Sequence, residues 1–248
     1  MPQMDYNEII ETRYGHRGRK MNKLELLHNV PAFSRLDDDQ LALLAASVGA
    51  QSFERGEIIF HQGSIGSILY IIVSGQVRIF TISEAGQELA LTIFRNGDFL
   101  GELALLDGLP RSASAQAMHP TTALTLHRAA FLHTIEACPP IAAAVLEAMA
   151  ARLRHTTIQA GQLGSASAPQ RVVRQLLNLA TQYGVAERDE TRIDLRLTQD
   201  DLASLSGTTR ETVNRVLSAL RDQQLIRLER AQVSVLSMAR LERSLEHW

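Results

Sequence analysis

The stretch from Gln51 to His127 constrains the fold more than any other part of this 248-residue chain. Short runs rich in β-branched and aromatic residues are separated there by glycines, as in antiparallel strands joined by tight turns. The glycines are Gly56, Gly63, Gly66, Gly75, Gly86, Gly97 and Gly101. Glycine adopts the positive φ that tight turns need at no steric cost. The pattern predicts an antiparallel barrel or jelly roll, with core strands at 58–60 and 69–73.

The segment Gly101–Ala115 adds chemistry to this framework. Glu102 follows a glycine, and nine residues later Arg111 precedes Ser112. A carboxylate accepts hydrogen bonds from sugar hydroxyls, a guanidinium binds phosphate oxygens, and small neighbours let backbone N–H groups approach a ligand. The segment therefore predicts a ribose-phosphate site. The alternative is a surface turn in which Glu102 and Arg111 form an ion pair.

The runs GEIIFHQG, LYIIVSGQVRI and FRNGDFLGELALL resemble the cyclic-AMP receptor protein (catabolite activator) / fumarate-nitrate regulator family of bacterial transcription regulators, in its cyclic-AMP-binding branch. The resemblance implies an α+β protein, with an N-terminal antiparallel β jelly roll that binds a cyclic nucleotide, a long dimerisation helix and a C-terminal winged helix-turn-helix. It implies cyclic AMP as the allosteric ligand. The jelly-roll residues implied to bind it are Gly101, Glu102, Leu103, Arg111 and Ser112.

A long helix is expected after Pro139 and Pro140, which suit a first helical turn. Its apolar positions follow 4-3 spacing at Ala142, Leu146, Met149, Leu153, Thr156, Ala160 and Leu163. This narrow seam predicts a homodimer through the helix Ala142–Leu163, and the alternative is a helix packed on its own barrel. By the resemblance of RLRHTT, Thr156 of one subunit and Thr157 of the other would bind the adenine. The alternative is that Thr156 bonds back to a helix carbonyl.

The second strong motif is TQDDLASLSGTTRETVNRVLSAL at 198–220, which predicts a helix-turn-helix. Thr198 with Asp201 is expected to begin the first helix, and Thr208 with Glu211 to form the capping box of the second. The inward residues would be Leu202, Leu205, Val213, Val216, Leu217 and Leu220. Around the motif we expect a short helix at 131–135, a linker at 161–167, a polar loop at 184–190, a strand at 191–197 and two wing strands within 225–236.

Outward residues on the second helix would face double-stranded DNA. These are Thr209, Arg210, Glu211, Asn214 and Arg215. Arg reads guanine and Glu accepts from cytosine in a major groove, whereas the alternative is a solvated Glu–Arg pair. The resemblance of TRETVNR implies that Arg210, Glu211 and Arg215 read bases of an inverted TGTGA-like repeat, with Thr198, Gln199 and Thr209 near phosphates. Asn214 replaces a glycine of the best-known member, which affects the neighbouring base preference.

Charge and cysteine content exclude several classes of protein. The net charge is −2, and the part from Ala168 onward carries 12 Lys and Arg against 11 Asp and Glu, so DNA affinity must come from the placement of a few cations. One cysteine, Cys138, cannot build a disulfide framework or a Cys-ligated cluster, and we expect it to be a packing residue. No metal site is expected. Apolar runs fall short of the ~18–20 residues of a membrane span, and no signal-peptide core is seen, so we expect a cytoplasmic protein without membrane contact.

The expected domains follow the chain in order. They are an N-terminal extension (1–20), the cyclic-nucleotide-binding β-barrel (21–137), the dimerisation helix (138–163), the hinge (164–167) and the winged helix-turn-helix (168–248). RNA polymerase is an expected partner of the DNA-bound protein. Alternatives are the same regulator with another effector, such as cyclic GMP, a cyclic dinucleotide or a haem-bound gas, or one acting without ligand. A jelly-roll metal enzyme and a kinase or channel module are disfavoured, since the histidines show no ligand pattern and a helix-turn-helix is attached.

Overall fold

The computed structural model describes residues 22–83, 88–163, 166–229 and 232–248. It divides into two compact units, one within Met1–Ile82 and Leu91–His155 and the other within Ser83–Ala90 and Thr156–Trp248. We call them the barrel unit and the helix-turn-helix unit. The division falls within one long helix, between His155 and Thr156. The five-part division expected from the sequence stays a prediction.

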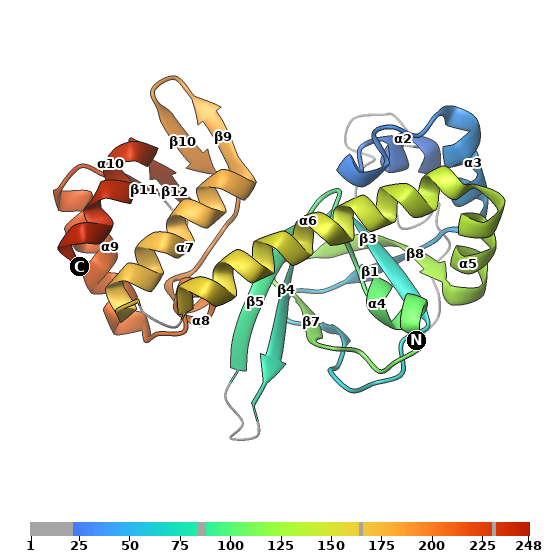
Figure 1. Ribbon diagram of the computed structural model, residues 1–248, viewed down its shortest axis with the longest axis horizontal. Helices are drawn as coiled ribbons and strands as arrows, with labels where there is room; N and C mark the ends of the chain where they lie inside the picture. The colour runs from blue at the N-terminus through green and yellow to red at the C-terminus, as the bar shows by residue number, and fades with distance from the viewer. Residues whose placement is uncertain (1–21, 84–87, 164–165, 230–231) are drawn as a thin grey trace. The chain divides into compact units, whose positions relative to one another are not determined.

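Two four-stranded antiparallel sheets form the barrel unit (Figure 1). One has the order β1-β8-β3-β6 and the other β2-β7-β4-β5. The strands are β1 (Gly49–Phe53), β2 (Ile58–Phe60), β3 (Ile68–Ser74), β4 (Gln76–Ile82), β5 (Glu88–Arg95), β6 (Phe99–Leu100), β7 (Ser114–Ala117) and β8 (Thr121–His127). The expected jelly-roll class is therefore confirmed, since non-consecutive strands are neighbours in both sheets.

Strand β3 shows how this sequence builds two cores from one run of apolar residues. Successive side chains on a strand point to opposite faces. Tyr70 and Ile72 are buried in the cluster between the sheets, whereas Leu69 and Ile71 are buried in the cluster that includes the helices. Each face therefore has its own apolar partner, which fixes the register of β3 against β8.

Helices cover the outer face of the β1-β8-β3-β6 sheet (Figure 1). They are α2 (Lys23–His28), η2 (Pro31–Phe33), α3 (Asp38–Ser47), α4 (Glu102–Asp107), α5 (Arg128–Ala137) and α6 (Pro139–Leu163). Asn22 and Asp37 begin α2 and α3 with complete capping boxes. Helix α5 is longer than the segment 131–135 expected from the sequence. Cys138 is buried in this cluster, as expected for a packing residue.

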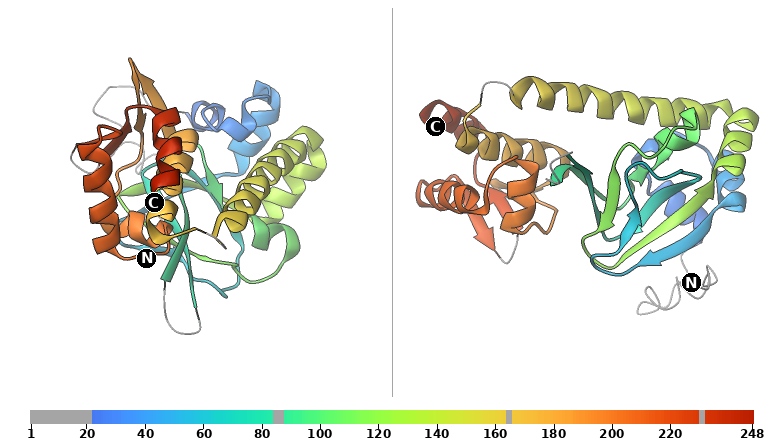
Figure 2. Two further views of the ribbon diagram at one scale, coloured as in Figure 1. Left: turned by 60° about the vertical axis from the view of Figure 1, so that its left-hand side comes forward. Right: turned by 90° about the horizontal axis from the view of Figure 1, so that it is seen from below.

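Helix α6 begins at Pro139 and runs as one helix to Leu163 (Figure 2). Ile141, Ala144 and Val145 are buried in the barrel core. Leu146 and Leu153 are 62% and 68% exposed. The helix therefore packs on its own barrel through one face, which was the alternative drawn from the sequence, and still exposes two leucines of the predicted seam. It also extends past Gly161, where the linker was expected to begin.

The helix-turn-helix unit combines a three-helix core with a four-stranded antiparallel sheet of order β11-β12-β10-β9. Its elements are α7 (Ala168–Tyr183), β9 (Gly184–Glu187), β10 (Glu190–Ile193), α8 (Gln199–Leu205), α9 (Arg210–Asp222), β11 (Ile226–Glu229), β12 (Gln232–Val235), α10 (Met238–Arg243) and η3 (Ser244–His247). The inward residues expected on α9 are all buried, and so is Leu202 on α8, whereas Leu205 is only half-buried. The two expected wing strands are β11 and β12.

Besides the strand expected at 191–197, which ends as β10 at Ile193, two local expectations are wrong in this unit. The polar loop expected at 184–190 contains β9, whose four residues are all exposed. An exposed strand needs no apolar alternation, because its backbone pairing with β10 supplies the stability. The second correction concerns the start of α9. Its N-cap is Thr209, which accepts a hydrogen bond from the N–H of Thr212, so the capping box between Thr208 and Glu211 does not form.

In the part of the chain that the structure describes, no helix taken singly has the length and apolarity to cross a membrane. A bent pair, α5 with α6 as far as Arg154, meets that requirement by length and composition alone. Several apolar residues of this pair, among them Phe131, Ile141 and Val145, pack into the barrel core described above.

Gly75 and Gly56 form a matched pair for testing the barrel turns. Both have positive φ, but a Cβ at Gly75 would lie 2.3 Å from Oγ1 and 2.7 Å from Cα of Thr121, whereas one at Gly56 would meet nothing within 4 Å. We expect Gly56→Ala to cost about 1–2 kcal/mol, from backbone strain alone, and Gly75→Ala to cost at least about 3 kcal/mol. Thermal unfolding midpoints of the two variants measure the difference, and equal midpoints would contradict this packing of Gly75.

Candidate functional site

The segment singled out in the sequence folds as the short helix α4 between β6 and β7. Gly101 precedes the helix with φ +87°, and a Cβ there would lie 2.3 Å from Nη1 of Arg111 and 3.0 Å from the carbonyl oxygen of Ile68. Only glycine therefore lets the backbone come this close to the arginine. Glu102, the first residue of α4, is only 8% exposed.

Arg111 is held from several sides and is only 5% exposed. Its Nη1 donates to the carbonyl of Gly101 at 2.7 Å and its Nη2 to the carbonyl of Ile68 at 2.6 Å. The ring of Phe60 covers the guanidinium, with 4.2 Å between Cζ and the ring centroid. The Arg111 backbone is also fixed, because its N–H donates to Ser64 and its carbonyl accepts from Gly63. Gly101, Ile68 and Phe60 thus hold the guanidinium in place, and the turn at 63–64 fixes the backbone behind it.

The positive charge of Arg111 has no anionic partner among the residues that the structure describes. Nε of Arg111 is buried and makes no hydrogen bond. Burial lowers the pKa of Arg111, and Tyr70 and Glu102 partly offset that effect. An arginine still stays charged at neutral pH, so the folded protein carries the cost of a buried cation. A bound anion would offset this cost and give Nε a partner.

Glu102 does not form the ion pair with Arg111 that the alternative reading required. Its Oε1 accepts from Nη1 of Arg152 at 3.0 Å, across 50 residues of sequence. Arg152 lies on α6, where it also donates to the carbonyl of Phe99 at 2.6 Å. The rings of Phe94 and Phe99 lie 4.5 and 4.3 Å from its Cζ. The carboxylate is therefore neutralised by a cation from the long helix, and Arg111 is left for another anion.

Sequence reasoning did not assign a role to Arg152, although the RLRHTT motif contains it. It also missed Phe60 and Gly66. A Cβ at Gly66 would lie 2.6 Å from Nε of Arg111, so a side chain at this position would clash with the buried guanidinium. The signal in the sequence was weak, because a glycine among serines is typical of any loop.

The structure brings Gly101, Glu102 and Arg111 together, but it does not do so for all the predicted residues. Leu103 is 42% exposed, and Ser112 is exposed beside Arg111. Thr156 and Thr157 are exposed on α6, one helical turn beyond Arg152. Their contacts with a ligand stay predictions. The donor set of the site fits a small anion with hydroxyl groups, since it offers a buried guanidinium nitrogen without a partner and a carboxylate close by.

The second predicted site is the exposed face at the start of α9. Val213, Val216, Leu217 and Leu220 are buried, so the opposite face is turned outward by helical geometry. Its residues are all exposed: Thr209, Arg210, Glu211, Asn214 and Arg215. Within the described ranges no ion pair joins Glu211 to Arg215. The surface pair that was the alternative to base contact is therefore not formed.

Arg210 is the first residue of α9, and it contacts the preceding helix. Its Nε donates to Oε1 of Gln199 at 3.4 Å, and its Nη1 lies 3.5 Å from Oδ2 of Asp200. Thr198 caps α8, with its Oγ1 accepting from the N–H of Asp201 at 3.1 Å. Thr198, Gln199 and Arg210 thus lie at one end of the two helices.

Arg171 fixes the turn between these helices, and sequence reasoning missed it. From α7 its Nε donates to the carbonyl of Ser206 at 2.9 Å and its Nη2 to that of Gly207 at 2.8 Å. Gly207 has φ +57°, so the turn exposes carbonyls that the helices do not satisfy. The arginine therefore holds α8 and α9 at a fixed angle.

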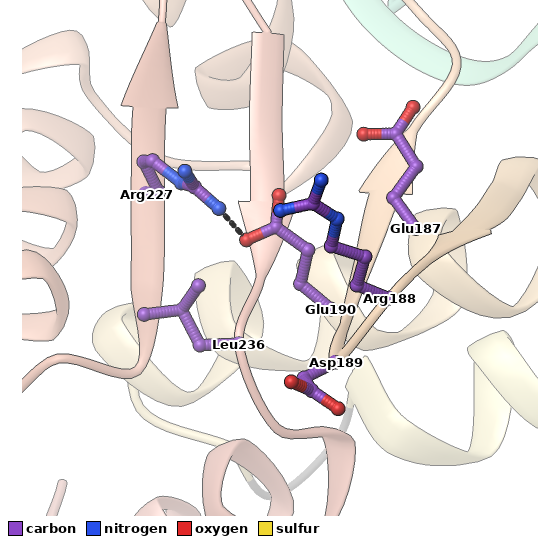
Figure 3. Close-up of a pocket in the computed structure, with 6 residues that line it drawn as sticks. All are labelled: Glu187, Arg188, Asp189, Glu190, Arg227 and Leu236. Atoms are coloured by element: carbon purple, nitrogen blue, oxygen red, sulfur yellow. Dashed lines mark hydrogen bonds and ion pairs between the residues drawn. The ribbon is translucent and has the colours of Figure 1, made fainter.

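The helix-turn-helix unit also contains an open cavity of about 680 Å³ at the β9–β10 turn (Figure 3). It is lined by Glu187, Arg188, Asp189, Glu190, Arg227 and Leu236. Figure 3 shows the ion pair of Arg227 with Glu190 across one side. Charges of both signs line this cavity, and it lacks a buried unpartnered cation. Among the described residues no cluster of three or more His, Cys, Asp or Glu could hold a metal ion.

Comparison with known proteins finds two family models that match most of this chain. Residues 50–138 match the family model described as a cyclic nucleotide-binding domain, and residues 170–244 match a Crp-like helix-turn-helix domain. The chain is 35% identical to the CRP-like cAMP-activated global transcriptional regulator of Mycobacterium tuberculosis, over 88% of this chain and 98% of the relative. It is 36% identical to the cyclic AMP receptor protein of Thermus thermophilus, over 86% of this chain and 95% of the relative.

A solved structure of similar fold is the c-di-GMP responsive global regulator CLP of Xanthomonas campestris. The TM-score is 0.68 and the identity 24%, with 81% of this chain and all of the other covered. At this identity the likeness shows the fold alone.

Two arginine variants test the electrostatics of the first site in the ligand-free protein. Arg152→Leu removes the partner of a buried carboxylate, and we expect a loss of about 2–3 kcal/mol in unfolding free energy. Arg111→Leu removes an uncompensated buried cation, and we expect a change within about 1 kcal/mol, because the relief of desolvation offsets the two lost hydrogen bonds. Denaturant unfolding measures both variants.

Adding Glu102→Gln to Arg152→Leu is the control, and it should restore part of the loss. An Arg111→Leu variant less stable than Arg152→Leu would contradict this assignment of charges.

Proposed function

The chain belongs to the CRP-like family of transcription regulators. We propose that it forms a homodimer whose affinity for DNA is controlled by cyclic AMP. The family is one of DNA-binding regulators and not of enzymes. We assign the site around Arg111 to the cyclic nucleotide-binding domain and the exposed face of α9 to the helix-turn-helix domain. The effector, the DNA sequence and the dimer are our proposals.

The observation that carries the cyclic-nucleotide proposal is the buried, unpartnered Nε of Arg111. A cyclic phosphate carries one negative charge and oxygens that accept hydrogen bonds, so it would neutralise the guanidinium. We assign the ribose hydroxyl to Glu102, whose Oε1 is already occupied by Arg152. Because Arg152 comes from α6, ligand and long helix would share one carboxylate.

We favour cyclic AMP over cyclic GMP because two relatives above 30% identity are named for cyclic AMP. Glu102 and Arg111 would contact sugar and phosphate, which both nucleotides share, so the choice of base rests on Thr156 and Thr157. Both threonines are exposed on α6 and would approach the adenine from two subunits. Cyclic GMP is therefore the nearest alternative effector.

The proposed dimer uses the exposed leucines of α6. Leu146 and Leu153 are seven residues apart, which is one heptad, and lie on the same face of the helix. Leucines this exposed are costly in water, and a second copy of the helix would bury them. The dimer would also bring the partner subunit's threonines to each nucleotide.

The proposed DNA site is an inverted repeat with TGTGA-like halves. Arg210, Glu211 and Arg215 would read base edges, while Thr198, Gln199 and Thr209 would lie near phosphates. Asn214 would face the base next to them. In a dimer, two such helices about 34 Å apart can enter successive major grooves. The nucleotide would stiffen α6 and shift a population that already contains the DNA-competent arrangement. RNA polymerase would contact the bound dimer, and the working compartment would be the cytoplasm.

The central prediction is that cyclic AMP raises the affinity for a TGTGA palindrome by at least about tenfold, a coupling typical of allosteric regulators. Fluorescence anisotropy of a labelled duplex, with and without nucleotide, measures it. Arg111→Leu should keep the basal DNA affinity and lose the response, since only the phosphate partner is removed. Arg78→Leu is the control, because Arg78 also stacks on a barrel phenylalanine, Phe80, but donates to Gln116.

Other outcomes distinguish the alternatives. A response to cyclic GMP or a cyclic dinucleotide alone would replace the effector and keep the regulator. Equal DNA affinity in every condition would point to a regulator that acts without ligand.

The dimer makes a separate prediction. Leu146→Asp should turn the protein into a monomer, because a carboxylate in the seam has no partner. Leu43→Asp is the control, since Leu43 is 45% exposed on α3, outside the seam. Analytical ultracentrifugation at micromolar concentration measures the mass. A Leu146→Asp protein that stays dimeric would place the interface elsewhere.

A further inference from the structure

The acidic residues that begin α8 are unexpected beside a surface that faces DNA. Asp200 is 68% exposed, and its Oδ2 lies 3.5 Å from Nη1 of Arg210. Gln199 contacts the same guanidinium through Oε1 at 3.4 Å. Arg210 is the first residue of the helix that would enter the groove. A carboxylate here lies where phosphates would approach, and it lowers the affinity of any duplex by repulsion.

We propose that Asp200, with Gln199, is a positioning residue that makes Arg210 selective for bases over phosphates. The inference rests on the proposed DNA-reading role of Arg210. Asp200 competes with phosphates for the guanidinium and keeps it close to the end of α8. On a matching duplex Arg210 gains a bidentate contact with a guanine, and this contact offsets the loss of the ion pair with Asp200. On other duplexes Arg210 contacts only phosphates, and these contacts do not offset the lost ion pair.

The charge balance of the unit makes one carboxylate important. From Ala168 to the end the chain carries 12 Arg and 11 acidic residues. Because the net charge is small, the loss of one carboxylate should have a measurable effect on DNA affinity. Removing one negative charge at the DNA surface should increase the number of released counterions by about one. An exposed pair contributes little to folding, so the effect should appear in DNA binding and not in stability.

A merely structural role for Asp200 is the alternative to exclude. Acidic residues near a helix start are favourable to the helix, and Asp200 lies in the first turn of α8. The capping box itself uses Asp201, which accepts from the N–H of Thr198 at 2.8 Å. Asp200 can therefore be changed without breaking the cap.

The far end of α9 offers a matched control. Asp222 pairs with Arg221 at 3.0 Å, and the exposures of that pair, 68% and 56%, are close to those of Asp200 and Arg210, 68% and 63%. Asp222→Asn therefore makes the same change of charge in the same unit, on an ion pair of similar exposure. It tests whether the position of the charge matters or only its sign.

The experiment measures DNA affinity of the full-length protein with saturating cyclic AMP. The probes are a TGTGA palindrome and a scrambled duplex of the same composition, each over a range of salt concentrations. We expect Asp200→Asn to tighten binding to the scrambled duplex by roughly threefold to tenfold and binding to the palindrome by less. The specificity ratio should fall, and the slope of log K against log salt should steepen by about one for the scrambled duplex. Asp222→Asn should leave the ratio unchanged.

The same substitution in an Arg210→Ala background identifies the route of the effect. If Asp200 acts through Arg210, Asp200→Asn no longer changes the specificity ratio there. An unchanged ratio on the wild-type background, or an equal change from Asp222→Asn, would overturn the inference and leave the proposed function intact. If the wild-type protein did not distinguish the two duplexes, the inference and the proposed DNA site would both be wrong.

Discussion

The candidate site of the barrel unit depends on a buried cation, Arg111, that has no anionic partner among the described residues. Arg111 donates to two backbone carbonyls, stacks on Phe60 and keeps Nε without a hydrogen bond. Two of its neighbours, Gly66 and Gly101, must be glycines, because a Cβ at either position would clash with the guanidinium. A buried cation without an anion is costly, because two carbonyls and an aromatic ring replace only part of the solvation that burial removes. In the proposed complex, a bound phosphate would relieve part of that cost.

Arg152 relates this site to the rest of the molecule. It lies on α6, its charge neutralises Glu102, and two phenylalanine rings hold it in place. A ligand that moves Glu102 would thus also move Arg152 and the long helix. In the proposed dimer the same helix forms the interface. Further along the chain, Arg171 fixes the helix-turn-helix angle. In each case an arginine binds carbonyls or a carboxylate from segments distant in sequence, and so fixes the position of one element relative to another.

The sequence predicted the elements whose signals are local. The glycine-spaced β runs predicted the jelly roll, and Thr198 predicted the start of α8. The apolar face of α9 was predicted correctly because its spacing is periodic. The misses have physical causes. Strand β9 is polar and exposed and depends on pairing with β10, and the capping residue of α9 is one of two adjacent threonines. The partner of Glu102 lies 50 residues away, and no local pattern reports which of several arginines will reach it. Contacts of this kind are set by packing.

The most direct test is a crystal structure of the protein with cyclic AMP. We predict the cyclic phosphate on Nε of Arg111 and a ribose hydroxyl on Glu102, with Arg152 still bound to the same carboxylate. A nucleotide bound elsewhere, with Arg111 contacting only the carbonyls of Gly101 and Ile68, would contradict it.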